Sequence, residues 1–412
     1  MHIKRPTRSI VTMLGAMLVT APAGYGADQI ATWNGTSGNW SDANEWSTTN
    51  YPDNGNGGIA TYDAEIIDGF GDVSVTLDVD VTIEGFTFDA VAGNALTRSA
   101  DLTVNDTFDW LDGDISGSGT LTLASGSTSN VSAGNVNIRD GEIVNHGTFN
   151  KTSSARLLFR DAVFTNNGTA DAQSDGSFIE RNSFASSATT FVDNTGTFLK
   201  SAGTGDTIID ATKFNNSGTV EVQTGRLGFA RGFAGASPGY TQTAGMLNLN
   251  GGDVFADDVA MDIQGGSIQG EGTISGDIDL AGTIAPGTSI GTLTLDDNAV
   301  SAEGDLTFAS GGEYAAELGT PGSADLLDLT GTLDLTTSGA VLSLSGGQLG
   351  ETYTIANYDS VASTFDSVTP GYTPDYGPNS LEVTVVPEPT TVALLGLGGL
   401  AMLPRRCRRY AS

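Results

Sequence analysis

Cysteine and histidine are almost absent from this chain of 412 residues. The one cysteine is Cys407, close to the C-terminus, and His146 is the only histidine outside the first ten residues. A chain with one thiol cannot build a disulfide framework or a thiolate metal cluster. A single histidine also excludes histidine-rich zinc sites and makes a catalytic triad implausible.

Basic residues are scarce as well, with 17 against 49 acidic residues and a net charge of −32. Seven of the basic residues lie within the first 27 and the last 27 positions, so the body between them holds 10 basic and 48 acidic residues. A surface this acidic repels phosphate backbones, and we expect no nucleic-acid partner. It suits solubility, association with cations and a position outside the cell.

Helical patterns are missing between the two termini. No apolar period of 3.6 residues is sustained there, and glycine, threonine and valine are frequent. Short runs instead alternate apolar and polar residues, as at 121–123 and 293–295. This alternation is typical of strands that bury one face, so the sequence predicts an all-β protein.

A short element recurs along the chain: Asn, a variable residue, Gly, Thr and an apolar residue. Its copies lie at 145–149, 166–170, 194–198 and 216–220, with glycines 21, 28 and 22 residues apart. Asparagine and glycine tolerate the positive φ of a sharp corner, and we interpret the element as a corner followed by a strand. His146 occupies the variable position, so we interpret it as a turn residue and not as a general base.

A corner and a strand at such intervals predict the coils of a right-handed parallel β-helix, a solenoid. With strands about 4.8 Å apart, roughly 14 coils would form a rod on the order of 65 Å long. The competing architecture is a β-sandwich, favoured most for the C-terminal part of the body, where turns are closer together. Segments at 285–293, 325–333 and 351–365 are similar to the final coils of autotransporter-type passenger domains, which implies coils there too.

The two ends of the chain have the composition of targeting segments. Three basic residues precede an apolar stretch from Ile10 to Val19, and small residues follow, which is signal-peptide architecture. At the other end an apolar run from Val392 to Leu403 is short of the roughly 20 residues of a comfortable spanning helix. We therefore interpret the end of the chain as a removable address, associated with the membrane through this short hydrophobic helix.

Two further features frame that apolar run. Pro387, Glu388 and Pro389 precede it, and an arginine cluster follows it, which favours the cytoplasmic side of a membrane. The cluster consists of Arg405, Arg406, Arg408 and Arg409. This order resembles the PEP-CTERM sorting signal of Gram-negative-type bacteria. The resemblance implies an exosortase-type membrane protease as partner, export to the cell envelope, surface or matrix, and an association with exopolysaccharide or biofilm.

Three tryptophans, Trp33, Trp40 and Trp46, lie close together behind the predicted leader. Their segment is similar to the tryptophan-rich opening of secreted, repeat-containing bacterial surface proteins. We interpret them as a cap over the apolar end of the solenoid, which would otherwise invite edge pairing. The alternative is a platform on which glycans stack, as in an adhesin.

Parallel β-helices also include polysaccharide lyases and glycoside hydrolases, which need paired carboxyl groups or a base beside acids. The candidate pairs are Asp112 with Asp114, Asp257 with Asp258, and Asp296 with Asp297, and the basic residues Arg139, Lys151, Arg156 and Arg160 are concentrated in one region. So many acidic residues produce such pairs by chance, and no cationic cluster lies beside them in sequence. We predict no catalytic residue and keep a carbohydrate-active enzyme as the alternative.

Calcium is the one ion that the acidic body suggests. Asp78 with Asp80, and Asp277 with Asp279, alternate so that both carboxylates project to one face. Hard oxygen ligands suit calcium, yet neither an EF-hand loop nor a calcium-binding nonapeptide repeat is present. We expect no cofactor and no defined metal site, only weak association with calcium.

The sequence thus predicts five regions. They are a signal peptide (1–27), a tryptophan-rich cap with the first coils (28–100), β-helix repeats (101–300), C-terminal coils or a sandwich-like region (301–385) and a sorting tail (386–412). The function expected from them is that of an exported, non-enzymatic surface or matrix protein.

Overall fold

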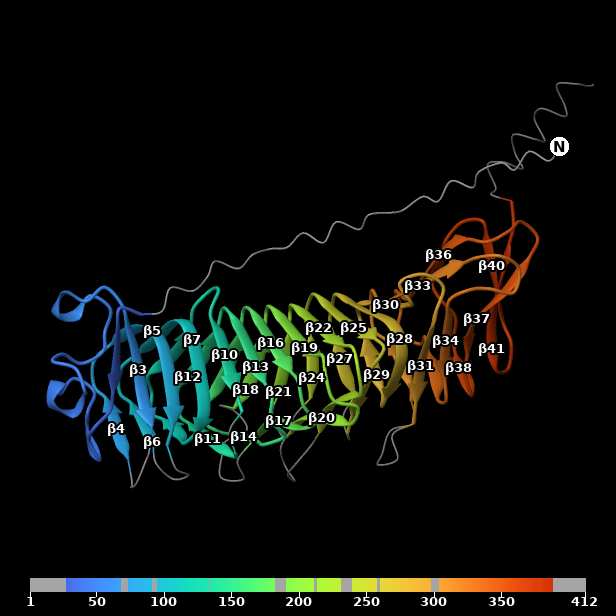
Figure 1. Cartoon of the computed structure of the whole chain (residues 1–412). Coiled ribbons are helices and arrows are strands. Elements are labelled where there is room, and N and C mark those ends of the chain that lie inside the picture. The colour runs from blue at the N-terminus through green and yellow to red at the C-terminus, as the bar shows by residue number, and fades with distance from the viewer. Residues whose placement is uncertain are drawn as a thin grey trace, which may run out of the picture.

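The computed structural model describes residues 27–67, 73–90, 95–132, 134–181, 190–210, 213–230, 239–257, 260–297 and 304–387. Figure 1 shows them as an elongated rod of stacked strands. Two short 3-10 helices, η1 (Ala43–Glu45) and η2 (Asn56–Gly58), belong to the N-terminal segment. The predicted leader up to residue 26 and the predicted hydrophobic helix of the tail lie outside the described residues.

The strands form three stacks, and each coil passes from the first stack to the second and then to the third. The first stack contains the N-terminal parts of β5 (Val81–Asp89) and β7 (Leu102–Asp112), then β9 (Thr120–Leu123), β12 (Glu142–Asn145), β15 (Val163–Asn166), β18 (Phe191–Asn194), β21 (Lys213–Asn216), β24 (Tyr240–Gln242), β27 (Met261–Ile263), β29 (Ile278–Leu280), β32 (Leu306–Phe308), β35 (Thr332–Asp334) and β38 (Ser360–Ala362).

The second stack lies beside the first. It contains β1 (Gln29–Thr32), β3 (Tyr62–Ile67), the C-terminal parts of β5 and β7, β10 (Thr128–Val131), β13 (Thr148–Lys151), β16 (Thr169–Ala172), β19 (Thr197–Lys200), β22 (Thr219–Val222), β25 (Met246–Asn250), β28 (Ser267–Ser275), β30 (Thr283–Pro286), β33 (Glu313–Leu318), β36 (Val341–Gly346) and β39 (Ser367–Val368).

The third stack completes each coil. It contains β2 (Ser37–Asn39), β4 (Ser74–Leu77), β6 (Ala95–Arg98), β8 (Asp114–Ser116), β11 (Val136–Arg139), β14 (Leu157–Arg160), β17 (Gly176–Arg181), β20 (Asp206–Asp210), β23 (Arg226–Ala230), β26 (Asp253–Ala256), the end of β28, β31 (Thr292–Asp296), β34 (Leu326–Leu329) and β37 (Thr352–Asn357).

All pairings within these stacks are parallel, so the prediction of a parallel β-helix is confirmed. Among the described residues the third stack holds 14 strands, in agreement with the roughly 14 coils expected. Coils continue through β39, so the sandwich expected as the runner-up for the C-terminal part is wrong. The described chain ends instead in an antiparallel hairpin of β40 (Tyr372–Tyr376) and β41 (Ser380–Val385), and β41 pairs with β37.

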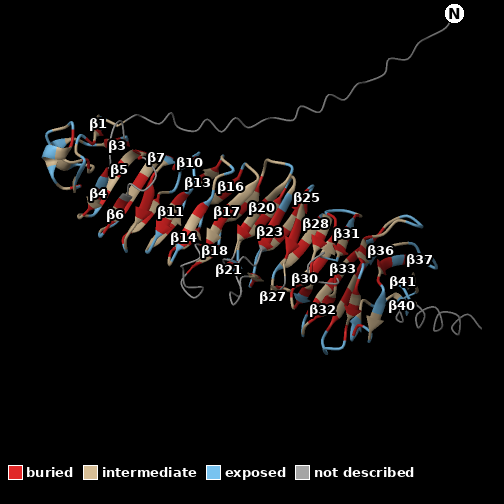
Figure 2. Cartoon of the chain, turned by 90° about the horizontal axis from the view of Figure 1, so that it is seen from below, coloured by how far each residue is buried: buried red, intermediate tan, exposed pale blue. Residues whose placement is uncertain are grey.

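Side chains alternate between the core and the surface along each strand, as the sequence pattern predicts. Leu121 and Leu123 of β9 are buried, while the threonines between and before them are only partly covered. Figure 2 shows buried residues along the whole described rod, so each coil contributes to one continuous core. A coil buries its apolar face only against its neighbours, which makes stacking the source of stability.

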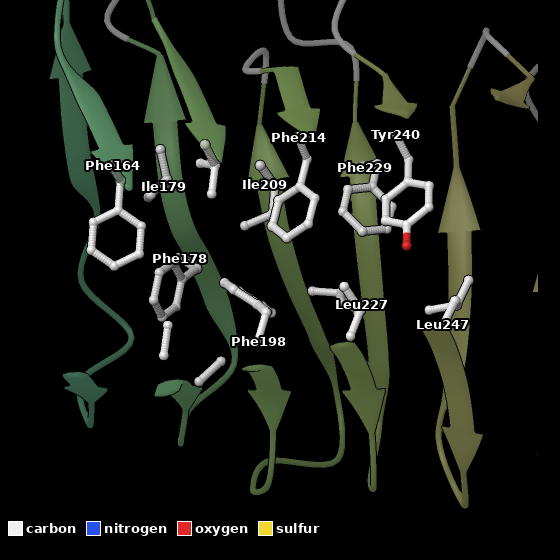
Figure 3. Close-up of a cluster of buried hydrophobic side chains, with 14 of the residues drawn as sticks. Phe164, Phe178, Ile179, Phe198, Ile209, Phe214, Leu227, Phe229, Tyr240 and Leu247 are labelled. Carbon is white, nitrogen blue, oxygen red and sulfur yellow. The ribbon is translucent and has the colours of Figure 1, made fainter. Parts of the chain in front are cut away.

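Aromatic rings fill the middle of this core. Figure 3 shows Phe178, Phe198, Phe214 and Tyr240 following one another through successive coils. Ring centroids lie 4.9 Å apart between Phe178 and Phe198, and 5.3 Å apart between Phe198 and Phe214. Edge-to-face pairs at these distances stabilise by about 0.5–1.5 kcal/mol beyond the burial of their area.

A ladder of buried amides follows the corner between the first and second stacks. The Nδ2 of Asn145 donates to Oδ1 of Asn166 at 2.7 Å, Asn166 donates to Asn194 at 2.7 Å, and Asn194 donates to Asn216 at 2.8 Å. Asn216 then donates to Oε1 of Gln242 at 3.1 Å. These five side chains are at most 1% exposed, and we call them the amide ladder.

The glycines of the repeated element serve a purpose other than the predicted one. Gly168, Gly196 and Gly218 do not have a positive φ, and neither do the asparagines of the amide ladder. A Cβ atom on any of these three glycines would lie 2.1 Å from the carbonyl oxygen of the equivalent glycine one coil earlier. The positive-φ interpretation is therefore wrong here, because close approach between corner backbones is what requires glycine.

Replacing Asn194 with Ala should lower the free energy of unfolding by about 2–3 kcal/mol, because Asn166 loses an acceptor and Asn216 loses a donor in a buried site. Urea unfolding followed by circular dichroism measures the change. Asn215→Ala is the matched control, since Asn215 lies on the neighbouring strand β21 and its bond to Asp193 of β18 is exposed. The control should cost less than about 0.5 kcal/mol. Equal effects of the two substitutions would contradict a stabilising ladder.

Candidate functional site

A cleft of about 380 Å³ opens on the second stack towards the C-terminal end of the rod. Small side chains form its floor: Ala285 of β30, Ala315 of β33 and Ser343 of β36, at equivalent positions in three coils. Segment 286–289 and the carboxylates of Glu317 and Asp325 also line the cleft. We call this cleft the small-residue groove, and its volume is in the usual range for sites that bind small molecules.

Asp325 holds the acidic part of the groove together. It is 2% exposed, its Oδ1 accepts from the Gly291 N–H at 2.9 Å and its Oδ2 accepts from the Glu317 N–H at 2.7 Å. Burial raises the pKa of Asp325, the charges of Glu317 and Glu271 raise it further, and the two backbone N–H groups oppose the shift. The carboxyl group therefore joins the segment after β30 to β33.

Sequence reasoning missed the small-residue groove. Glu317 and Asp325 are not adjacent in the chain, and their neighbours Ala315 and Ser343 look unremarkable on their strands. The signal is the recurrence of small outward-facing residues at equivalent positions of successive coils. It can be found only once the register between coils is known.

The acidic pairs singled out in the sequence have separate structural partners. Asp78 accepts from the backbone and hydroxyl groups of Ser41, whereas Asp80 accepts from the Asp101 N–H, so the two carboxylates do not share one site. Asp114 is buried and accepts from Asn137 and from Arg139. These carboxylates hold adjacent coils in register, and three or more His, Cys, Asp or Glu side chains are nowhere grouped as a metal site in the part of the chain described.

The remaining pairs are equally ordinary. The backbone N–H of Asp297 donates to Asp296 Oδ1 at the exposed end of β31, and Asp277 Oδ1 accepts from the Asp305 N–H at 3.0 Å. Asp258 lies outside the described residues. Asp277 thus bonds to the backbone of the next coil, and weak association of the acidic surface with calcium stays a prediction.

One charged cluster on the third stack does align across coils. Glu180 of β17 is in register with Asp210 of β20, and Arg156 pairs with Glu180 at 3.2 Å. Burial raises the pKa of Asp210, Glu180 and Asp257 add to the rise, and Arg156 with Arg181 oppose it. Two carboxyl groups in register, one of them with a raised pKa, have the composition of a general-acid pair.

The three tryptophans are buried. Trp33, Trp40 and Trp46 are 0–5% exposed, and the rings of Trp33 and Trp40 pack against Trp46 with centroids 5.0 and 4.7 Å away. Trp40 also contacts Phe86 of β5, and the Trp46 indole donates to the Trp40 carbonyl at 2.8 Å. A ring that stacks on a glycan must be open to solvent, so these three indoles do not form the glycan-stacking platform considered as the alternative.

The same segment covers a strand edge. The backbone of Ser47 donates to Thr32, the last residue of β1, and Trp33 forms an antiparallel bridge with Trp46. Among the described strands β1 pairs only with β3, so this segment lies along the side of β1 that no strand occupies. The buried tryptophans and the covered edge of β1 therefore lie together at the N-terminal end of the rod.

At the opposite end of the rod, β41 ends at Val385, and Val386 and the exposed Pro387 follow it. Glu388, Pro389 and the arginine cluster lie outside the described residues, as does the apolar run before the arginines. Within the described ranges no helix is both long and apolar enough to cross a membrane. The end of the last strand is therefore the place where the tail leaves the folded body.

The comparison with protein families decides what this tail is. Residues 385–409 match the family model described as the PEP-CTERM protein-sorting motif. The chain carries a PEP-CTERM sorting motif. The comparison with curated proteins found no match.

The PEP-CTERM motif indicates exosortase-dependent export to the bacterial cell surface and processing by an exosortase-type membrane system. It begins at Val385, which is also the last residue of β41, the last described strand. Pro387 lacks the backbone N–H that would donate a hydrogen bond to a neighbouring strand.

Lys151 is a buried cation in the interior of the second stack. It is 2% exposed, and its Nζ donates to the carbonyl oxygen of Ser153 at 2.6 Å. Burial lowers the pKa of Lys151 from 10.5 to about 8. Such a shift corresponds to a penalty of roughly 3 kcal/mol on the charged form. The contacts of Lys151 are thus those of a structural residue.

Lys151→Met should raise the free energy of unfolding at pH 7, because it removes a buried charge. In the parent protein Lys151 loses its proton near pH 8 in the folded state and near pH 10.5 in the unfolded state. The penalty therefore falls as the pH rises from about 8 and is gone above 10.5. The gain should therefore be largest below pH 8 and shrink above it. Urea midpoints at several pH values measure it, with the exposed Lys213→Met as control. A gain that does not change with pH would argue against a buried charge.

Proposed function

We propose that this protein is a non-enzymatic extracellular rod that is delivered to the cell surface and associates there with exopolysaccharide. The PEP-CTERM motif is the single observation that carries the proposal, since it indicates export to the surface. Three further features support it: a solenoid body, a net charge of −32 and an exposed junction between the last strand and the motif. A long acidic rod remains soluble and presents an extended polar face to a hydrated matrix.

The tail is tested by cell fractionation with mass spectrometry of the C-terminus of the native protein. We expect surface or matrix protein that ends near Pro387, because the short apolar run and the arginines serve as an address. Replacing Pro387, Glu388 and Pro389 together by Ala should leave an intact tail on membrane-bound protein. Thr390→Ala with Thr391→Ala is the control and should be processed normally. An intact end from Arg405 to Ser412 on cytoplasmic or freely soluble protein would sink the proposal.

A carbohydrate-active enzyme is the second candidate function, and the alignment of Glu180, Asp210 and Arg156 on the third stack favours it. Glycoside hydrolysis needs an acid and a carboxylate on either side of one bond, with further donors that stabilise developing charge. Ion pairing between Arg156 and Glu180 accounts for these residues without catalysis, and we rank the enzyme second.

Release of reducing ends from the polysaccharide of the producing cells separates the two candidates. We expect the purified protein to release none above a heat-denatured control. Release that falls by about a hundredfold or more in Asp210→Asn, as loss of a general acid predicts, would establish the enzyme instead. Arg226→Gln tests an exposed ion pair on the same stack and serves as the control substitution.

A further inference from the structure

We propose that the small-residue groove binds an amine-bearing polysaccharide, a chain of glucosamine type, with consecutive sugars lying across consecutive coils. The inference rests on the proposed function and names the class of glycan that this rod would hold. It depends on the shape of the groove, the sign of its charge, the rigidity of its acidic part and the polar row that lies beside it.

The shape follows from a change in one row of outward-facing residues. Asn248 and Gln269 occupy this row in two coils, and Ala285, Ala315 and Ser343 occupy it in the next three. The long polar side chains stop where the small ones begin, so the surface drops into the groove. Floor positions recur at the strand spacing of about 4.8 Å, which is similar to the length of one sugar in an extended chain.

The charge of the groove selects a cation. Its lining contains Glu317, which is exposed, and Asp325, and it contains no lysine or arginine. Glu271 adds a third carboxylate close to Gly291. Uronate, sulfate and phosphate groups would be repelled here, whereas a protonated amine is attracted. Gln269 and Ser289 supply the amide and hydroxyl groups that bind sugar hydroxyls, whereas the Ser343 hydroxyl already donates to Glu313.

The acidic part is held in place before any ligand arrives. Asp325 accepts from the N–H groups of Gly291 and Glu317, and the Gly287 N–H donates to the Gly270 carbonyl at 2.7 Å. These bonds join the segment after β30 to β28 and β33. Asp325 is therefore a positioning residue, and a groove held in this way loses little entropy when a ligand binds.

A row of hydroxyl groups lies on the same face of the second stack, two positions before the groove row on each strand. Beyond Thr219 it is interrupted by Met246 and then resumes as Ser267 and Thr283 beside the groove. Six threonines are in register on six successive coils, and none of their hydroxyl groups hydrogen-bonds to another described residue. They are Thr107, Thr128, Thr148, Thr169, Thr197 and Thr219. A regular polar row along the rod favours a long repeating ligand over a single small molecule.

Calorimetric titration of the purified exported protein with glucosamine oligomers tests the proposal. We expect binding that weakens as salt is added, weaker binding of N-acetylglucosamine oligomers, and none of oligogalacturonate. Ala315→Phe fills the groove from the solvent side and should weaken binding by about tenfold or more, since it blocks the floor. Ala362→Phe, an outward-facing site on the first stack, is the matched control and should bind like the parent.

Glu317→Gln removes one charge from an exposed side chain without changing its size, so it tests the groove even if Ala315→Phe does not fold. It should weaken binding by about threefold to tenfold and reduce the dependence on salt. No binding to glucosamine oligomers, equal binding to acetylated ones, or unchanged binding in both groove variants would overturn the proposal. If the protein reaches the surface normally but gives any of these results, the groove is not a glycan-binding site and the proposed function stands. If the protein is cytoplasmic but binds the oligomers, the proposed function is wrong and the binding site stands.

Discussion

The amide ladder, together with the glycine corners beside it, is the constraint on which the rest of the rod depends. Asn145, Asn166, Asn194 and Asn216 each donate to the next coil, and each would leave a buried polar group unsatisfied if its neighbour moved. The glycine corners then bring successive backbones so close that no Cβ atom fits. Hydrogen bonds and sterics thus set the same register, which a purely apolar core would leave free to slip.

Once the register is set, every outward position becomes part of a row that runs along the rod. The threonine row and the small-residue groove both arise in this way, from side chains that are far apart in the chain. Two ends of the stack then need protection, because an unpaired strand invites another chain. The buried tryptophans lie along β1 at one end, and the antiparallel hairpin of β40 and β41 finishes the other.

Much of the fold could be predicted, because a repeat with alternating apolar residues has few ways to bury them. The coils and their number followed from the spacing of the Asn-x-Gly-Thr element. The reason assigned to its residues was wrong, since Gly196 avoids a clash with a neighbouring coil and Asn194 is buried, and neither adopts positive φ. The groove of Ala315 and Glu317 could not be predicted, because small and acidic residues acquire meaning there only from neighbours one coil away.

The sequence by itself determined that the chain is exported and that it is a solenoid. Both properties follow from the local order of residues. Export follows from Pro387 before an apolar run and arginines, and the solenoid follows from a short element repeated along the body. The tertiary structure alone decided which side chains are available. It buried Trp33, Trp40 and Trp46, assigned carboxylates such as Asp114 to structural bonds, and left Glu317 exposed beside a hollow. The physical reason is that coil-to-coil register, set by buried hydrogen bonds, brings together residues about thirty positions apart in the chain.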